Sequence, residues 1–319
     1  MYVLSFIHYL ESKVIPNQSN IPLWDFWKNP NTTTIEDLTT IQVTDKDGLQ
    51  FFYLNSVLGR DNTIKIDFNN VSAINEHWMK GLPLKVTTHG WKGSEQKSTD
   101  NKEETVYDIN MAYVDLGGFN IITVDWKGMA DSPYGFPMSA ALALAVGSAV
   151  AVFLENVVNQ TGIAPSDIHL IGHNLGVHVV GRCGFRFQKG KIGRITGLDP
   201  NNIRHYLSTL DLKPLSANDA EFVDVIHTAG GNLGCMDSLG HADFFPNSGM
   251  YNQPGCSVTF DYPLASVDCS QKRAYQLYID SVIHRNSLMG VSCSSWDDFT
   301  NDKCNNNFQM AMGHDASPR

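Results

Sequence analysis

The chain has 319 residues, of which 42% are apolar and 18% are charged, a composition typical of a globular protein with a large core. Its formal net charge of -10 leaves no basic surplus, which argues against nucleic acid as a partner. No uninterrupted apolar run reaches about 18 residues, so we expect no transmembrane segment.

Residues 1–35 are polar and turn-rich, and they predict an N-terminal arm ahead of a single domain over residues 36–319. The apolar start of the chain lacks a basic stretch and a small-residue cleavage site, so it is a poor signal peptide. The six cysteines and the Asn-x-Ser/Thr sequences nevertheless indicate a secreted, extracellular glycoprotein. The glycosylation candidates are Asn17, Asn31, Asn70 and Asn159.

Strand and helix patterns then alternate along the chain. A hairpin is predicted first, with strands at 40–43 and 49–54 joined by a turn at 45–48. Further strands are predicted at 83–88, 119–126, 168–171, 194–198 and 222–226, and helices at 138–158, 175–187 and 273–283. The alternation predicts an α/β fold, with a mainly parallel central sheet flanked by helices.

Residues Gly172-His173-Asn174-Leu175-Gly176 match the pattern G-x-S-x-G with asparagine in place of serine. In that pattern a strand turns sharply into a helix and raises the central side chain over the sheet. The central residue has positive φ, which asparagine tolerates better than most residues. Its amide has no O–H and cannot form an acyl-enzyme as serine does. The turn is therefore predicted to be retained without its nucleophile.

The chain resembles the pancreatic-lipase family of α/β-hydrolases, especially the insect branch of short-lid lipases, venom phospholipases A1 and yolk proteins. The resemblance covers roughly residues 40–315 and implies an α/β-hydrolase fold without a C-terminal β-sandwich domain. The segments that carry it are residues 88–91, 124–126, 170–178, 195–200, 222–228 and 240–247.

The resemblance assigns the three triad positions to Asn174, Asp199 and Gln271. The acid is kept, but the nucleophile is replaced by an amide, and the histidine base by glutamine, which has no basic nitrogen. The family's oxyanion hole is expected from the backbone N–H groups of Trp91 and Leu175. An alternative is that the segment at Trp91 only makes a tight turn with a packed indole.

Other nucleophilic or basic residues near these segments are expected to be structural. We expect the side chains of His173 and His178 to point away from the path of a nucleophile, and Cys183 to lie too far along the helix. His227 and His241 are expected to be hydrogen-bonded within the fold.

No metal and no cofactor are expected. The resemblance matches Asp219 to one carboxylate of the family's calcium site, but Ser216 stands where a second ligand is expected. Calcium prefers six to eight oxygen ligands, several of them from carboxylates.

The resemblance also implies a disulfide between Cys256 and Cys269 and another between Cys293 and Cys304. Cys183 and Cys235 are a third candidate pair, although six cysteines allow fifteen connectivities. The first disulfide closes a short lid over residues 257–268, with three large apolar side chains. These three either line a remnant acyl groove or pack down and seal it: Phe260, Tyr262 and Leu264.

The loss of two triad residues predicts a secreted lipase homologue without catalysis, with storage or a yolk-type role as the first hypothesis. The second is a carrier that binds a fatty acid, a sterol or another apolar ligand in the remnant groove. The third is a weak lipase or phospholipase A1-type ester hydrolase. The sequence neither favours nor excludes a binding protein that pairs with an active lipase, or a homo-oligomer.

Overall fold

The computed structural model describes residues 43, 47–93, 106–203, 214–256 and 263–318. The predicted N-terminal arm, residues 1–35, lies outside the described residues, and so do the glycosylation candidates Asn17 and Asn31.

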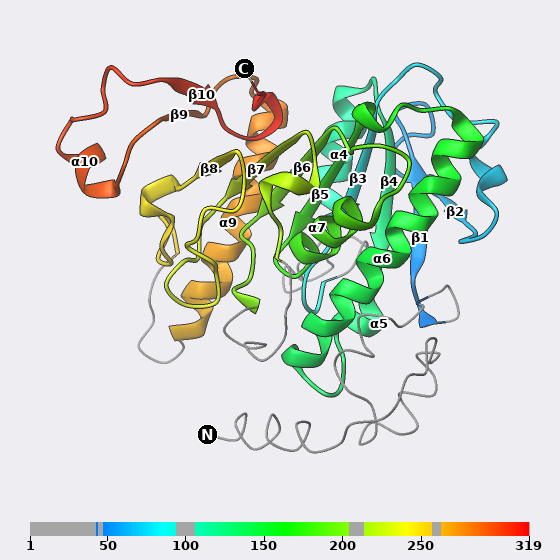
Figure 1. Ribbon diagram of the computed structural model, residues 1–319, viewed down its shortest axis with the longest axis horizontal. Helices are drawn as coiled ribbons and strands as arrows, with labels where there is room; N and C mark the ends of the chain where they lie inside the picture. Colours follow the sequence, from blue (N-terminus) through cyan, green and yellow to red (C-terminus); the bar gives the residue numbers. More distant parts are fainter. Residues whose placement is uncertain (1–42, 44–46, 94–105, 204–213, 257–262, 319) are drawn as a thin grey trace.

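An eight-stranded sheet forms the centre of the molecule, in the order β2-β1-β4-β3-β5-β6-β7-β8 (Figure 1). β1 is antiparallel to both of its neighbours, whereas β4, β3, β5, β6, β7 and β8 all run parallel. The strands are β1 (Gln50–Leu54), β2 (Ile64–Ile66), β3 (Leu84–Thr88), β4 (Asn120–Asp125), β5 (Ile168–His173), β6 (Arg194–Leu198), β7 (Phe222–Ile226) and β8 (Ala242–Phe244). The predicted mainly parallel sheet is confirmed.

The hairpin predicted at the start of the sheet named the wrong partner strand for β1. β1 pairs with β2 on one edge and with β4 on the other. Both edges of β1 are therefore occupied by other strands. Of the predicted strand at 40–43 only Val43 is described, and it is buried outside any strand.

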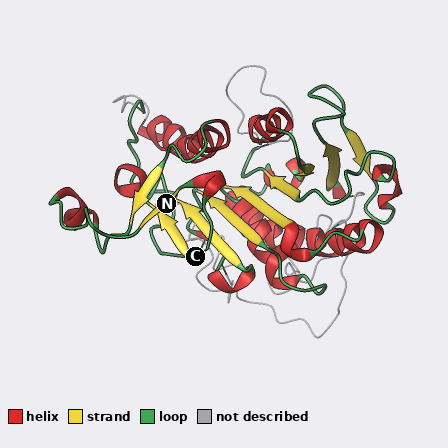
Figure 2. Ribbon diagram, turned by 90° about the horizontal axis from the view of Figure 1, so that it is seen from above, coloured by secondary structure: helices red, strands yellow, loops and turns green. Residues whose placement is uncertain are grey.

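Helices cover both faces of the sheet (Figure 2). They are α4 (Tyr107–Leu116), α5 (Lys127–Ala130), α6 (Phe136–Thr161), α7 (Gly176–Arg186), α9 (Pro263–Ile283) and α10 (Trp296–Thr300). Short 3-10 turns occur at η2 (Val71–Ile74), η3 (Pro165–Asp167), η4 (Ala217–Asp219), η5 (Pro246–Gly249) and η6 (Gly313–Asp315).

Alternating side chains of the strands belong to two separate hydrophobic cores, one on each face of the sheet. In β5, Leu170 packs into the core under α6 and α7, and its neighbour Ile171 packs into the core under α4 and α9. Successive side chains of a strand point to opposite faces, and a strand buried on both faces needs apolar residues at consecutive positions. This explains why β4 was recognisable by a short apolar run.

The long apolar helix α6 is a core helix of this domain. Its length and composition would allow it to cross a membrane, but 72% of its most apolar window is buried inside the protein. Gly147 brings α6 close to α7, because a Cβ there would lie 2.7 Å from Cβ of Arg182. The helix ends at Gly162, whose φ of 72° is the left-handed conformation common at helix C-termini.

Helix α9 begins at Pro263, ten residues before the predicted start at Arg273. A proline at the first helical position is favourable, because its missing N–H has no partner there in any case. The second half of the predicted lid is therefore the first turns of α9. α4 and β8 were also absent from the sequence prediction.

A disulfide-closed arm follows α9 and projects from the body of the domain (Figure 1). It contains the two-stranded sheet of β9 (Met289–Val291) and β10 (Gln309–Ala311), with α10 between them. Cys293 and Cys304 are joined in this arm.

Candidate active site

The turn between β5 and α7 has the predicted backbone geometry. Asn174 has φ of 57° and is 3% exposed. Gly172 and Gly176 are required on either side, because a Cβ on Gly172 would overlap the carbonyl of Gly176, and one on Gly176 would lie 2.6 Å from the carbonyl oxygen of His89. The glycines thus let the turn pass close to the end of β3.

The side chain of Asn174 fills the position that an oxyanion hole would offer to a substrate. Its Oδ1 accepts hydrogen bonds from the backbone nitrogen of Leu175 at 2.8 Å and from that of Trp91 at 3.3 Å. These are the two N–H groups that the sequence predicted as the remnant hole. Both are therefore directed at one oxygen, and that oxygen belongs to the protein itself.

A third amide, Asn201, joins the two degenerate positions. Asn174 and Asn201 exchange side-chain hydrogen bonds in both directions, at 3.1 and 3.0 Å. Gln271 donates its Nε2–H to Asn201 Oδ1 at 3.1 Å. All three side chains are buried. They form a closed network of amides, without an ionisable group, where a nucleophile and a base would stand.

Asp199, the predicted triad acid, is held by the backbone after β7. It follows β6 with φ of 45°, and its Oδ1 accepts hydrogen bonds from the backbone nitrogens of Thr228 and Ala229 at 2.9 and 2.8 Å. Gln271 donates to Asn201 and not to Asp199. Burial raises the pKa of the Asp199 carboxyl to about 6, against the opposing effect of the two backbone donors.

The histidines beside the turn donate to backbone carbonyls. Nε2 of His173 lies 3.1 Å from the carbonyl oxygen of Gln271, and Nε2 of His178 lies 2.8 Å from that of Asn201. Burial lowers the pKa of each histidine to about 4. Both rings are therefore neutral at pH 7, and these hydrogen bonds tie α7 and α9 to the site.

The other two histidines also have structural partners. His227 lies between Asp243 and the carbonyl oxygen of Cys235, with its ring nitrogens 2.8 Å from each. Nδ1 of His241 accepts the backbone N–H of Val223 at 3.0 Å. These contacts hold the loops after β7 in place.

Two of the expected disulfides are present, and the third is wrong. Cys256 is joined to Cys269, and Cys293 to Cys304. Cys183 and Cys235 are both buried thiols. Cys183 packs in the core on α7, whereas Cys235 lies in the loop after β7, where its backbone nitrogen donates to Pro200.

The predicted lid is described only in part. Phe260 and Tyr262 lie outside the described residues, and the backbone of Leu264 belongs to the first turn of α9.

The residues matched to the family's calcium site have a different role. Asp219 caps the turn η4, where its Oδ2 accepts the backbone N–H of Ser216 at 2.8 Å.

Two glycosylation candidates lie in the described part of the chain, and both are exposed. Asn70 precedes η2 and accepts the backbone N–H of Ser72 at 3.1 Å, and Asn159 lies near the end of α6.

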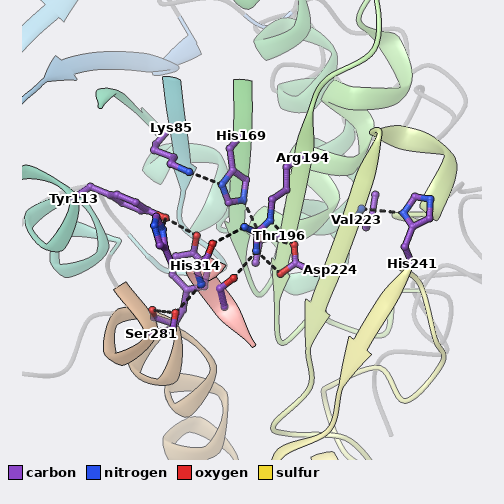
Figure 3. A network of polar contacts seen from close by, with 12 residues as sticks. Lys85, Tyr113, His169, Arg194, Thr196, Val223, Asp224, His241, Ser281 and His314 are labelled. Atoms are coloured by element: carbon purple, nitrogen blue, oxygen red, sulfur yellow. Dashed lines mark hydrogen bonds and ion pairs between the residues drawn. The ribbon is translucent and has the colours of Figure 1, made fainter. Parts of the chain in front are cut away.

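A second buried polar network lies on the face of the sheet covered by α4 and α9, near the starts of the parallel strands (Figure 3). Lys85 Nζ lies 2.9 Å from Nδ1 of His169, and Nε2 of His169 lies 2.8 Å from Oγ1 of Thr196. Thr196 donates a hydrogen bond to the carboxylate of Asp224. The same carboxylate accepts hydrogen bonds from Nε and Nη2 of Arg194.

Arg194 also ties the C-terminal segment to the sheet, because it donates to the carbonyl oxygens of Gly313 and His314. No motif in the sequence predicted this network. The signal available was a set of charged or polar residues inside otherwise apolar strands.

The fold and the strand-turn-helix after β5 define an α/β-hydrolase. A family model described as Lipase matches residues 27–318, and the chain belongs to the lipase family.

Pancreatic triacylglycerol lipases are among the relatives of this chain. That of Myocastor coypus is 37% identical over 219 residues, which are 63% of this chain and 46% of that protein. That of Mus musculus is 32% identical over 271 residues, or 79% of this chain and 55% of that protein. The chain spans about half the length of these curated relatives.

Solved α/β-hydrolases are more distant. An alpha/beta hydrolase from a Medee basin deep-sea metagenome library is 16% identical, with a TM-score of 0.36 and coverage of 69% of this chain and 91% of that one. The fold assignment rests on the sheet itself and on the family model.

Proposed function

We propose that this chain is a lipase-family protein that does not hydrolyse esters. The observation that carries the proposal is the position of the Asn174 side chain, whose oxygen accepts hydrogen bonds from Leu175 and Trp91. An ester substrate needs these two donors for the negative charge that develops in its transition state. Here an internal amide already uses them.

The residue types at the predicted triad positions support the same proposal. An amide at position 174 has no proton-bearing nucleophile, and Gln271 has no basic nitrogen that could activate one. Removing triad members from a working enzyme leaves only the small rate enhancement supplied by binding and the oxyanion hole. In this protein the oxyanion hole is occupied as well.

We propose secretion and a storage or yolk-type role for the protein. The two disulfides are the kind of bond that persists in oxidising compartments. Storage requires a stable, soluble fold and no open site, which agrees with a closed amide network at the old catalytic centre.

The pocket beside the amide network gives no support to the carrier role, whereas the lid residues Phe260 and Tyr262, which would line a remnant acyl groove, lie outside the described residues. The pocket beside the network, lined in part by His178, Asn201 and Cys235, has a volume of about 10 Å³, enough for roughly one water molecule. Sites for drug-sized ligands are typically about 300 Å³ or larger. A fatty acyl chain does not fit this pocket.

Two measurements on the protein purified from its natural source test the proposal. With p-nitrophenyl butyrate, we expect release of p-nitrophenol at the rate of the buffer alone. Turnover that rises in proportion to protein concentration and stops with a serine-hydrolase inhibitor would contradict it. Native mass spectrometry should show the mass of the protein with its glycans. A stoichiometric lipid, without turnover, would instead establish a carrier.

A further inference from the structure

Asn201 lies between the two positions where a nucleophile and its base would meet. It comes directly after Asp199-Pro200 at the end of β6, and it is 3% exposed. Its carbonyl accepts a hydrogen bond from His178 at 2.8 Å, which fixes its backbone against α7. The fold therefore sets its backbone position, and Asn174 and Gln271 hold its side chain.

Both degenerate side chains donate to the same atom of Asn201. Asn174 Nδ2 and Gln271 Nε2 each lie 3.1 Å from its Oδ1. A carbonyl oxygen has two lone pairs, and here both are used. A working serine hydrolase instead needs a direct hydrogen bond between nucleophile and base, about 2.6–3.2 Å long.

We propose that Asn201 is a positioning residue that keeps triad chemistry from this site even where serine and histidine stand at positions 174 and 271. The inference rests on the proposed function and extends it, because it names a third position that had to differ from a working enzyme. Restoring serine and histidine at the two known positions is then insufficient to restore hydrolysis.

The physical reason is the tautomer that Asn201 imposes on an imidazole at position 271. A general base in a triad carries its proton on Nδ1, donates it to the acid, and accepts the serine proton at Nε2. Asn201 Oδ1 is an acceptor at the place where Gln271 Nε2 now donates. It stabilises an imidazole with its proton on Nε2, so the lone pair no longer faces the serine. The partner of a ring nitrogen decides which one is protonated.

Two variants separate the effect of Asn201 from that of the other positions. One carries Asn174→Ser and Gln271→His, and the second adds Asn201→Ala. With p-nitrophenyl butyrate, the serine oxygen attacks the ester carbonyl while its proton passes to the imidazole and on to the departing p-nitrophenolate. Water then attacks the acyl-serine and releases butyrate.

We expect the triple variant to turn over at least about 100-fold faster than the double variant, which is the low end of what a general base contributes. A matched control places Asn202→Ala in the double variant, since Asn202 is the adjacent asparagine: its backbone nitrogen donates to Leu233, and its side chain has no hydrogen bond among the described residues. The control should remain at the level of the double variant. Equal turnover of the folded double and triple variants overturns the inference.

Nitrogen-15 NMR of the imidazole at position 271 shows which ring nitrogen carries the proton. This observation does not depend on the overall stability of the variant. We expect the proton on Nε2 in the double variant and on Nδ1 in the triple variant. The Nε2–H tautomer persisting in the triple variant would overturn the inference. Hydrolysis by the unmodified protein would instead overturn the proposed function, so the two failures are distinguishable.

Discussion

The side-chain oxygen of Asn174 accepts the backbone N–H of Leu175 at 2.8 Å. In a lipase this N–H stabilises a substrate oxygen during the reaction. The residue at the predicted nucleophile position thus satisfies the two backbone donors predicted for an oxyanion hole. The site is closed by hydrogen bonds that stabilise the fold.

Replacing Asn174 tests how much the network stabilises the protein. Asn174→Gly should lower the free energy of unfolding by about 2 kcal/mol, because buried donors in Leu175 and Asn201 lose their acceptor. Asn174→Ala should cost about 1 kcal/mol more, since alanine carries a Cβ into the left-handed conformation. Urea unfolding measures both. Equal stability of the two variants would contradict the role of the positive φ.

The glycines of the turn should be intolerant of substitution. Gly172→Ala is expected to cost about 3 kcal/mol or more, because the new Cβ overlaps the backbone of Gly176 and overpacking forces backbone shifts. Gly128→Ala is the matched control, since a Cβ on Gly128 would have no neighbouring atom within 4 Å among the described residues. Thermal unfolding of the pair should show a large loss for the first variant only. Similar midpoints would show that the turn can move.

Lys85 should make stability depend on pH above neutrality. Burial against Tyr113 and Phe119 lowers its pKa from 10.5 to about 7, with Arg194 adding to the shift and Asp224 opposing it. Between these pH values the unfolded chain binds a proton that the folded chain does not. Stability from this group therefore rises with pH across the window and is lowest below pH 7.

The slope from one such group is at most about 1.4 kcal/mol per pH unit. In Lys85→Met, the free energy of unfolding measured with urea between pH 7.5 and 9.5 should no longer show this slope. The control Lys80→Met changes an exposed lysine and should leave the slope as it is. An unchanged slope in Lys85→Met would show that Lys85 is charged in the folded protein.

Thiol labelling tests the corrected disulfide pattern. The folded protein should react with iodoacetamide at neither Cys183 nor Cys235, because both thiols are buried and burial raises the pKa of Cys183. After unfolding without a reductant, the mass should increase by two alkyl groups. Prior reduction should give six. No labelling without reductant would establish a third disulfide.

The sequence predicted the parts of the fold that are controlled by local pattern. β4 contains a short apolar run, and the turn at Asn174 is specified by Gly172 and Gly176. The partner of β1 could not be predicted, because strand pairing between distant segments depends on which edge of the sheet is open. The start of α9 was missed because its first turns contain polar residues and cysteine within a segment that the family resemblance made a lid.

The sequence predicted candidate residues for the site but not the contacts among them. The resemblance located Asn174, Asp199 and Gln271, because each lies within a recognisable motif. It gave no indication of Asn201, since this residue acts through its side-chain geometry and matches no triad position. An asparagine directly after Asp199-Pro200, at the carboxyl end of β6, was the available signal.

The central claim is that position 174 holds no nucleophile and that its side chain fills the oxyanion hole. The most direct test is intact-mass measurement after incubation with a fluorophosphonate, which labels activated serines in hydrolases. The triple variant with Asn174→Ser, Gln271→His and Asn201→Ala is the positive control. We predict no mass increase for the unmodified protein. A single stoichiometric adduct, abolished by prior heat denaturation, would contradict the account.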